Sequence, residues 1–175
     1  MSKTVIVTGA SRGIGHAISL YYAKKGFNVC VCCHKNADML DSLKDEIENI
    51  GADCMTYVGN IGIFENAAEF FSLIKERFGK ADILINNAGI SYIGLLQDMT
   101  PSDWNNIITS NLTSVFNCCK LAIPIMLGSH EGKIINISSV WGCVGASTEV
   151  AYSATKGGIN AFTKALAKEL APSNI

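Results

Sequence analysis

Short apolar runs alternate with longer amphipathic segments from one end of the chain to the other. The apolar runs are rich in β-branched residues and predict strands at residues 3–8, 28–33, 53–58, 82–85 and 132–137. The segments between them carry apolar residues at helical spacing and predict helices at 14–25, 36–50, 63–78, 100–127 and 150–170. This alternation constrains the fold strongly, because parallel strands need crossover connections, which are usually helices.

Strands that are apolar throughout are typical of a parallel sheet covered on both faces. The crossovers should be right-handed, which predicts an α/β fold with a doubly wound, Rossmann-like sheet of strand order 3-2-1-4-5. The sequence has no repeat, low-complexity tract or linker, so we expect residues 1–175 to form a single domain. We also expect Asn36 to cap the helix at 36–50 and Thr100 to cap the helix at 100–127.

The composition narrows the possible partners. Hydrophobic residues make up 49% of the chain and the net charge is -1, so neither a nucleic acid nor an anionic membrane surface is an expected partner. The N-terminus lacks the pattern of a signal peptide, and the longest uncharged stretches are interrupted by Asn, Ser and Gly. We therefore expect a cytoplasmic protein with a small-molecule partner and no membrane span.

The seven cysteines do not suggest a metal site. They include no CxxC pair, and no histidine lies at ligand spacing from them. An odd number of cysteines without an export signal suits a reducing compartment. We expect them to act as small buried hydrophobic residues.

A glycine-rich loop, TGASRGIG at 8–15, lies between the first predicted strand and the first helix. Gly9 would allow the tight turn, Gly13 would let the backbone approach a pyrophosphate, and Gly15 would let the helix pack close to the strand. The start of the helix would offer free N–H groups to phosphates. In this strand-loop-helix setting the loop predicts a dinucleotide site, although such glycines alone could form only a turn.

The residues that follow the second strand should select the cofactor. An acid there would hold a ribose 2′-hydroxyl, whereas a cation would hold a 2′-phosphate. The sequence there, residues 33–36, is CHKN and contains no acid. Arg12 in the glycine loop adds a cation nearby. These features favour NADP(H) over NAD(H), unless Arg12, His34 and Lys35 are ordinary surface residues.

Tyr152 and Lys156 are four residues apart on the last predicted helix, so they share a face. An ammonium group beside a phenol favours the phenolate, which would let the tyrosine act as a general acid or base. Ser138 and Ser139 follow the fifth strand, where doubly wound sheets place their ligands, and Asn111 is a polar residue within an apolar helical run. Alternatively, Tyr152 and Lys156 could be a surface pair and the two serines a turn after the strand. Asn111 could be an exposed helix position.

Together these features resemble the short-chain dehydrogenase/reductase family. The resemblance rests on TGASRGIG at 8–15, NNAG at 86–89, Asn111, Ser139 and YSATK at 152–156, in the family's order and spacing. It implies an NAD(P)-binding domain in which Tyr152 transfers the proton and Lys156 assists it while holding the nicotinamide ribose. Ser139 would orient the carbonyl, Ser138 would be structural, and Asn111 would hold a water of the proton relay.

The resemblance also implies a set of cofactor-binding residues, among which Asn60 matches the family's adenine-contacting position. The set is Gly9, Ser11, Arg12, Gly13, Ile14, Gly15, His34, Asn60, Ile61, Asn87, Ala88, Gly89, Tyr152 and Lys156.

The amino-acid sequences of the motifs are most similar to those of the bacterial 3-oxoacyl-[acyl-carrier-protein] reductases of fatty-acid synthesis. This implies an NADPH-dependent carbonyl reductase acting on a carrier-bound 3-oxoacyl or other small-molecule substrate. Relatives with similar motifs act on steroids, sugars, sugar alcohols and small ketones, and these substrates stay open. Family members are commonly homo-oligomers, so we expect a tetramer or dimer with interfaces on the helices at 100–127 and 150–170.

Members of the family usually continue beyond the catalytic helix with two more strands and a substrate-covering segment. The sequence in hand ends at that helix, so we expect it to be truncated relative to the family. The fifth strand would then be an apolar sheet edge that favours oligomers or low stability. A dinucleotide-binding module without turnover is the alternative function.

Overall fold

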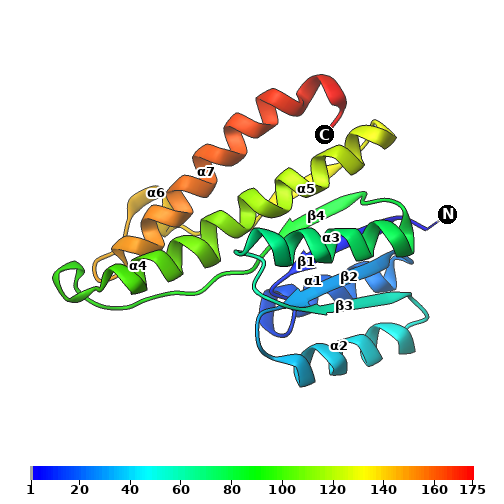
Figure 1. Cartoon of the computed structure of the whole chain (residues 1–175), viewed down its shortest axis with the longest axis horizontal. Coiled ribbons are helices and arrows are strands. Elements are labelled where there is room, and N and C mark those ends of the chain that lie inside the picture. The colour runs from blue at the N-terminus through cyan, green and yellow to red at the C-terminus, as the bar shows by residue number, and fades with distance from the viewer. Residues whose placement is uncertain (1) are drawn as a thin grey trace.

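Strands and helices alternate along the computed structural model, which describes residues 2–175 (Figure 1). The strands are β1 (Thr4–Thr8), β2 (Asn28–Cys33), β3 (Cys54–Val58), β4 (Ile83–Asn86) and β5 (Lys133–Asn136). The main helices are α1 (Gly13–Lys24), α2 (Ala37–Asn49), α3 (Phe64–Phe78), α4 (Pro101–Ile108), α5 (Ser114–Ser129), α6 (Trp141–Val144) and α7 (Val150–Leu170). Short 3-10 turns lie at η1 (Leu96–Asp98) and η3 (Ala171–Ser173), and a π-helical turn at η2 (Thr109–Thr113).

All strand pairs are parallel, and the sheet order is β3-β2-β1-β4-β5. The predicted doubly wound α/β fold is therefore confirmed. The central strand β1 is fully buried and pairs Val5 with Val29 of β2 on one side and with Ile83 of β4 on the other. At the edge of the sheet, β5 is partly exposed, with Ile135 at 42%.

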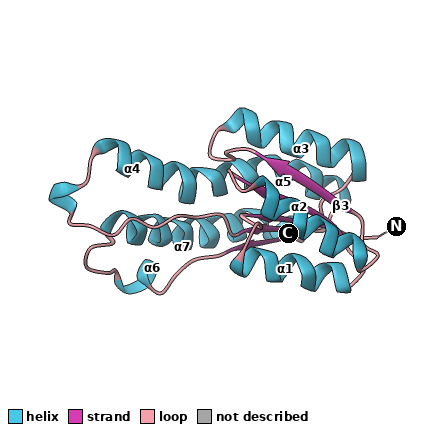
Figure 2. Cartoon of the chain, turned by 90° about the horizontal axis from the view of Figure 1, so that it is seen from below, coloured by secondary structure: helices cyan, strands magenta, loops and turns pink. Residues whose placement is uncertain are grey.

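The sheet is covered on both faces, and each face has its own core. On one face α3, α5 and α7 contribute Phe70, Cys118 and Ile159 to a cluster with strand residues such as Ile6. On the other face α1 and α2 pack Ala23 and Leu43 against alternate strand residues such as Val5 and Val29. Figure 2 shows α1 and α3 on opposite sides of the strands. Alternating side chains of apolar strands thus supply both cores.

The predicted helix at 100–127 is one helical stretch, Pro101–Ser129, but it is not a regular α-helix throughout. It begins as predicted with a capping box, in which Thr100 accepts from the Asp103 N–H and Asp103 accepts from the Thr100 N–H. The π-helical turn η2 then widens the helix around Asn111, whose side chain is hydrogen-bonded to the backbone of Ile90. A sequence pattern of apolar spacing cannot reveal such a local widening.

By length and composition alone, the stretch Pro101–Ser129 is apolar enough to cross a membrane. In this fold its inner face is buried in the core, with Ile107, Val115, Ala122 and Met126 each at most 2% exposed. It lies alongside α7 in Figure 1 and contacts α3 and β4. These contacts are those of the core helix of a sheet protein.

All seven cysteines are free thiols, and six of them are buried, as the sequence predicted. Burial raises the pKa of Cys32 and of Cys54 to about 12, because a thiolate loses its hydration there. Cys143, on α6, is exposed and departs from the prediction.

We expect only Cys143 to react when the folded protein is treated with Ellman's reagent near pH 8. Thiolates are the reactive species, and the six buried thiols are both covered and hard to ionise. The measurement is the number of thiols released in a fast phase, compared with the number released in denaturant. Cys143→Ser should remove the fast phase, and a fast phase of two or more thiols would contradict this fold.

Candidate active site

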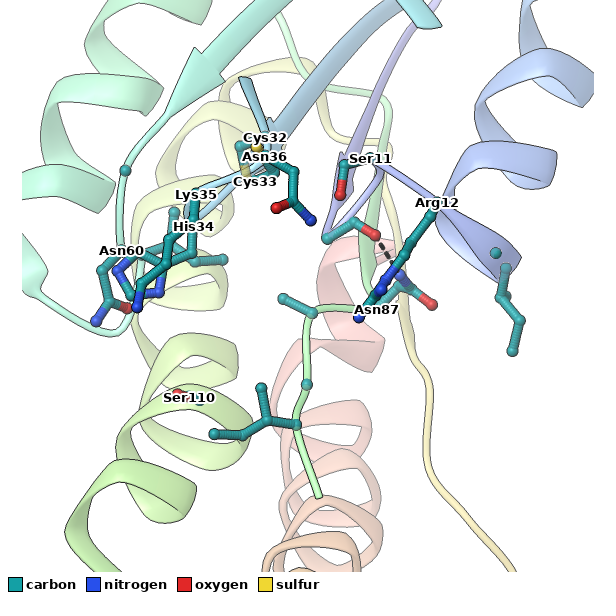
Figure 3. Close-up of a pocket in the computed structure, with 18 of the residues that line it drawn as sticks. Ser11, Arg12, Cys32, Cys33, His34, Lys35, Asn36, Asn60, Asn87 and Ser110 are labelled. Atoms are coloured by element: carbon teal, nitrogen blue, oxygen red, sulfur yellow. Dashed lines mark hydrogen bonds between the residues drawn. The ribbon is translucent and has the colours of Figure 1, made fainter. Parts of the chain in front are cut away.

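A cavity of about 590 Å³ opens at the carboxyl ends of β1, β2, β3 and β4. Its walls come from the loops that follow these strands, at 9–14, 32–36, 59–61 and 87–90, together with Asn106 and Ser110 from the long helix (Figure 3). In the sheet order, the chain runs from β1 outward to β3 and then returns to β4 on the other side of β1. The crevice at such a reversal is where doubly wound sheets bind ligands.

The loops after β1 and β4 are tied together by four hydrogen bonds. The Thr8 hydroxyl accepts from the backbone N–H groups of Asn87 and Ala88, each at 3.0 Å. The Asn87 amide donates to the carbonyls of Thr8 and Gly9, also at 3.0 Å each. These bonds hold the glycine loop against the NNAG segment, and they satisfy backbone groups that the sheet no longer pairs.

Each glycine of the loop meets a different steric demand. Gly9 has φ +65°, and a Cβ there would lie 2.7 Å from the Cα of Ala88. At Gly15 a Cβ would lie 2.6 Å from the Gly9 carbonyl oxygen and from the Asn87 Nδ2. Gly13 has φ +61° but faces open space, since no atom lies within 4 Å of its would-be Cβ. The loop is therefore packed tightly on its inner side and leaves room for a ligand at Gly13.

The start of α1 fits an anionic group. Its N-cap residue is Arg12, and no side chain caps the first N–H groups of the helix. Uncapped N–H groups at a helix start carry a partial positive charge and can bind phosphate oxygens. Ser11, Arg12 and Asn87 line the cavity in this region (Figure 3).

The far end of the cavity is formed by the segment after β2 and the loop after β3. His34, Lys35 and Asn60 line the cavity there (Figure 3). The lining from this segment is Cys32, Cys33, His34, Lys35 and Asn36, and it contains no carboxylate. Asn36 precedes α2 but makes no side-chain capping bond, contrary to our expectation, and its side chain lies at the cavity instead.

Asn111 is fully buried in the π-helical turn, so it is not an exposed helix position. Its side chain binds the backbone of Ile90 twice, accepting from the N–H at 2.8 Å and donating to the carbonyl at 2.9 Å. It also donates to the Thr155 hydroxyl on α7 at 3.2 Å. Asn111 thus connects the loop after β4 with the helix that carries Tyr152 and Lys156.

Tyr152 and Lys156 lie side by side on α7, with the Lys156 Nζ 5.6 Å from the centre of the Tyr152 ring. Lys156 is only 4% exposed, and its ammonium donates to the Ile137 carbonyl at 2.7 Å. Burial lowers the pKa of Lys156, because the ammonium loses hydration. A Cβ on Gly89 would lie 3.7 Å from the Lys156 Nζ, so the lysine lies next to the cavity wall.

The serine pair follows β5, and its first member contacts the same helix. Ser138 donates to the Lys156 carbonyl at 3.2 Å, which fastens the loop to α7. Ser139 accepts from the Trp141 N–H at 3.2 Å as the chain enters α6, and α6 packs on α7 at Gly142. The two serines therefore differ in their contacts: Ser138 holds the helix backbone, whereas Ser139 lies at the start of the next turn.

Eleven of the fourteen residues predicted to bind the cofactor line the cavity directly. The other three are Gly15, which packs beneath the loop, and Tyr152 and Lys156, which lie beyond Gly89. Sequence reasoning missed the roles of Thr8, Asn117 and Thr155, which are buried and hydrogen-bonded to this region. Asn117 could have been found by the signal that identified Asn111, since it too is polar within an apolar helical run.

The chain is similar to known proteins in sequence and in fold. The family model described as short chain dehydrogenase matches residues 3–175. A 3-oxoacyl-[acyl-carrier-protein] reductase FabG from Staphylococcus aureus (strain N315) is 42% identical over 178 residues, which cover 100% of this chain and 71% of that protein. The FabG of Thermotoga maritima is 37% identical over 173 residues and covers 99% and 70%, respectively.

Two solved structures are also similar. One is a putative short-chain alcohol dehydrogenase from Sinorhizobium meliloti 1021, with a TM-score of 0.93 and 33% identity, covering 99% of this chain and 69% of that one. The other is a metagenomic short-chain oxidoreductase in complex with NADP, with a TM-score of 0.94 and 31% identity, covering 98% and 76%.

Gly15→Ala should destabilise the protein by about 1–3 kcal/mol, since the new methyl group would overlap the Gly9 carbonyl and the Asn87 amide. The measurement is the midpoint of thermal or urea unfolding. Gly128→Ala is the matched control, because that helical glycine has no atom within 4 Å of its would-be Cβ. The control should gain up to about 1 kcal/mol from better helix propensity. Equal stability of Gly15→Ala and the unsubstituted protein would contradict the close packing.

Proposed function

Because the chain belongs to the short chain dehydrogenase family, whose members are NAD(P)-dependent oxidoreductases acting on carbonyl or hydroxyl groups, we propose that it is an NADPH-dependent reductase of 3-oxoacyl thioesters. The observation that carries the proposal is the pairing of Lys156 with Tyr152 against Gly89, at one end of the cavity. A protein that only bound the dinucleotide would need the glycine loop but not this pair. The reductase is expected in the cytoplasm, which agrees with its free thiols.

The residues present fit a bound dinucleotide. The uncapped start of α1 and the open side of Gly13 suit the pyrophosphate, and Lys156, next to Gly89 of the cavity wall, would hold a nicotinamide ribose. When bound, the cofactor supplies the hydride that reduces the carbonyl carbon.

The chain's own residues handle the proton. Tyr152 donates its phenolic proton to the carbonyl oxygen as that oxygen becomes a hydroxyl, and the Ser139 hydroxyl donates a hydrogen bond to the same oxygen. The Lys156 ammonium stabilises the phenolate that is left behind. Asn111 holds the loop at Ile90 and, in this proposal, a water that returns a proton to Tyr152.

The preference for NADPH rests on the charges of the cavity lining. Arg12, His34 and Lys35 line the cavity, and the segment after β2 offers no carboxylate to a ribose 2′-hydroxyl. A 2′-phosphate carries negative charge that the Arg12 guanidinium and the Lys35 ammonium would attract. The similar short-chain oxidoreductase solved with NADP supports the same choice.

A fatty-acyl substrate is supported by apolar side chains near α7. Ile93, Val140 and Val144 are 77%, 62% and 71% exposed, on the loop after β4 and on the segment that forms α6. The loop after β4 lies against the connection between α6 and α7, because the Gly94 N–H donates to the Thr148 carbonyl at 2.9 Å. Apolar side chains there would suit the chain of a 3-oxoacyl group, on a carrier protein as the FabG relatives' names describe.

We also propose that the protein is a homo-oligomer, a tetramer or a dimer. The outer face of the long helix exposes Trp104 and Phe116, at 37% and 47%. Large aromatic side chains on an exposed helix face are typical of protein interfaces.

Tyr152→Phe should lower the rate of acetoacetyl-thioester reduction by about 10²–10⁴-fold, because the proton donor is lost. The dissociation constant for NADPH should change little. Both are measured on the same preparation, by NADPH absorbance and by fluorescence titration. Tyr21→Phe, at an exposed position on α1, is the control and should leave both values unchanged. Undiminished turnover by Tyr152→Phe would contradict the proposed mechanism.

Arg12→Ala should reduce kcat/KM with NADPH about tenfold while leaving kcat/KM with NADH nearly unchanged, because a charged hydrogen bond to the 2′-phosphate is lost. The measurement is the ratio of the two constants. Lys168→Ala removes a charge at the end of α7, away from the cavity, and should not alter the ratio. An equal loss with both cofactors would place Arg12 at the pyrophosphate and remove the support for NADPH.

A further inference from the structure

Asn117 is a buried amide in the middle of the apolar face of α5. It is 2% exposed, and its neighbours Val115, Cys118 and Cys119 are all core residues. A polar group in such a position is costly unless its hydrogen bonds are made. The Asn117 Nδ2 donates to the Ile61 carbonyl at 3.0 Å and to the Gly62 carbonyl at 3.1 Å, so both of its hydrogens are engaged.

The carbonyls that Asn117 binds belong to the loop after β3, which forms one wall of the cavity. Gly59, Asn60 and Ile61 line the cavity, whereas Asn117 does not. The loop lies between β3 and α3 and has no sheet partner to fix it beyond the bond from the Gly59 N–H to the Cys33 carbonyl. Within the loop, the Asn60 side-chain oxygen accepts from the Gly62 N–H, and the Asn60 carbonyl accepts from the Ile63 N–H and from the side-chain amide of Asn66 on α3.

The position of this loop identifies the part of the cofactor that it meets. The Tyr152–Lys156 pair lies beyond Gly89, so the nicotinamide belongs at that end of the cavity. The phosphates belong at the start of α1, between the two ends. The remaining end, formed by the segment after β2 and by Gly59–Ile61, is left for the adenosine half.

We propose that Asn117 is a positioning residue for the adenosine half of the cofactor, acting through the backbone of Ile61 and Gly62. The inference rests on the proposed function and adds to it that two different asparagines support the two ends of the cofactor site. Along one helix, the Asn111 amide holds the loop at the nicotinamide end and the Asn117 amide holds the loop at the adenosine end.

The test is Asn117→Leu, which keeps the size of the side chain and removes both donors. It should raise the dissociation constants of NADPH and of adenosine 2′,5′-bisphosphate by about tenfold each, because the loop loses two hydrogen bonds. At saturating NADPH, kcat and the KM for acetoacetyl thioester should stay within about twofold of the unsubstituted protein. Asn117→Ser keeps one donor on a smaller side chain and should bind both probes with an intermediate affinity. It replaces Asn117→Leu in the test if the leucine variant does not fold.

Cys118→Ala is the matched control, since it leaves a cavity in the same buried stretch of α5 and removes none of the hydrogen bonds that Asn117 makes to the loop. It should lower the melting temperature but leave both dissociation constants unchanged. The inference is overturned if both Asn117 variants bind the two probes as tightly as the unsubstituted protein, or if Cys118→Ala weakens binding equally. If the unsubstituted protein binds neither probe, the proposed function fails and this inference fails with it.

Discussion

The site depends on the hydrogen bonds that join the ends of β1 and β4. The Thr8 hydroxyl and the Asn87 amide are short side chains that pair four backbone groups just where the two strands separate. Gly9 and Gly15 allow this close approach, because a Cβ at either position would overlap the opposite loop. With the two loops fixed, the start of α1 points into the cavity and Gly89 is placed beside Lys156.

The long helix holds two loops of the cavity from the side opposite the junction of β1 and β4. Two of its buried asparagines are bonded to the backbone of two different loops, Asn111 to Ile90 and Asn117 to Ile61 and Gly62. The π-helical turn places Asn111 so that it also reaches Thr155 on α7. One helical stretch is therefore hydrogen-bonded to two of the loops that form the walls of the cavity.

Much of this arrangement could be predicted from the sequence. The strand order followed from the alternation of apolar runs with amphipathic helices, and the glycine loop was recognisable because it lies between a strand and a helix. Other features could not be predicted. Asn36 makes no capping bond although its residue type and position suggest one, because capping depends on backbone angles that the side chain does not set alone. The role of Asn117 depends on a loop more than fifty residues earlier in the chain.

The sequence by itself determined the fold class, the family and the residue types available for chemistry, because these depend on local periodicity and on motifs of fixed spacing. Only the tertiary structure decided how those residues meet. It buries Lys156 beside Tyr152, encloses Asn111 completely and leaves Gly13 open to a ligand. The physical reason is that burial and hydrogen-bond partners arise from long-range packing of the sheet against its helices, which no single stretch of sequence contains.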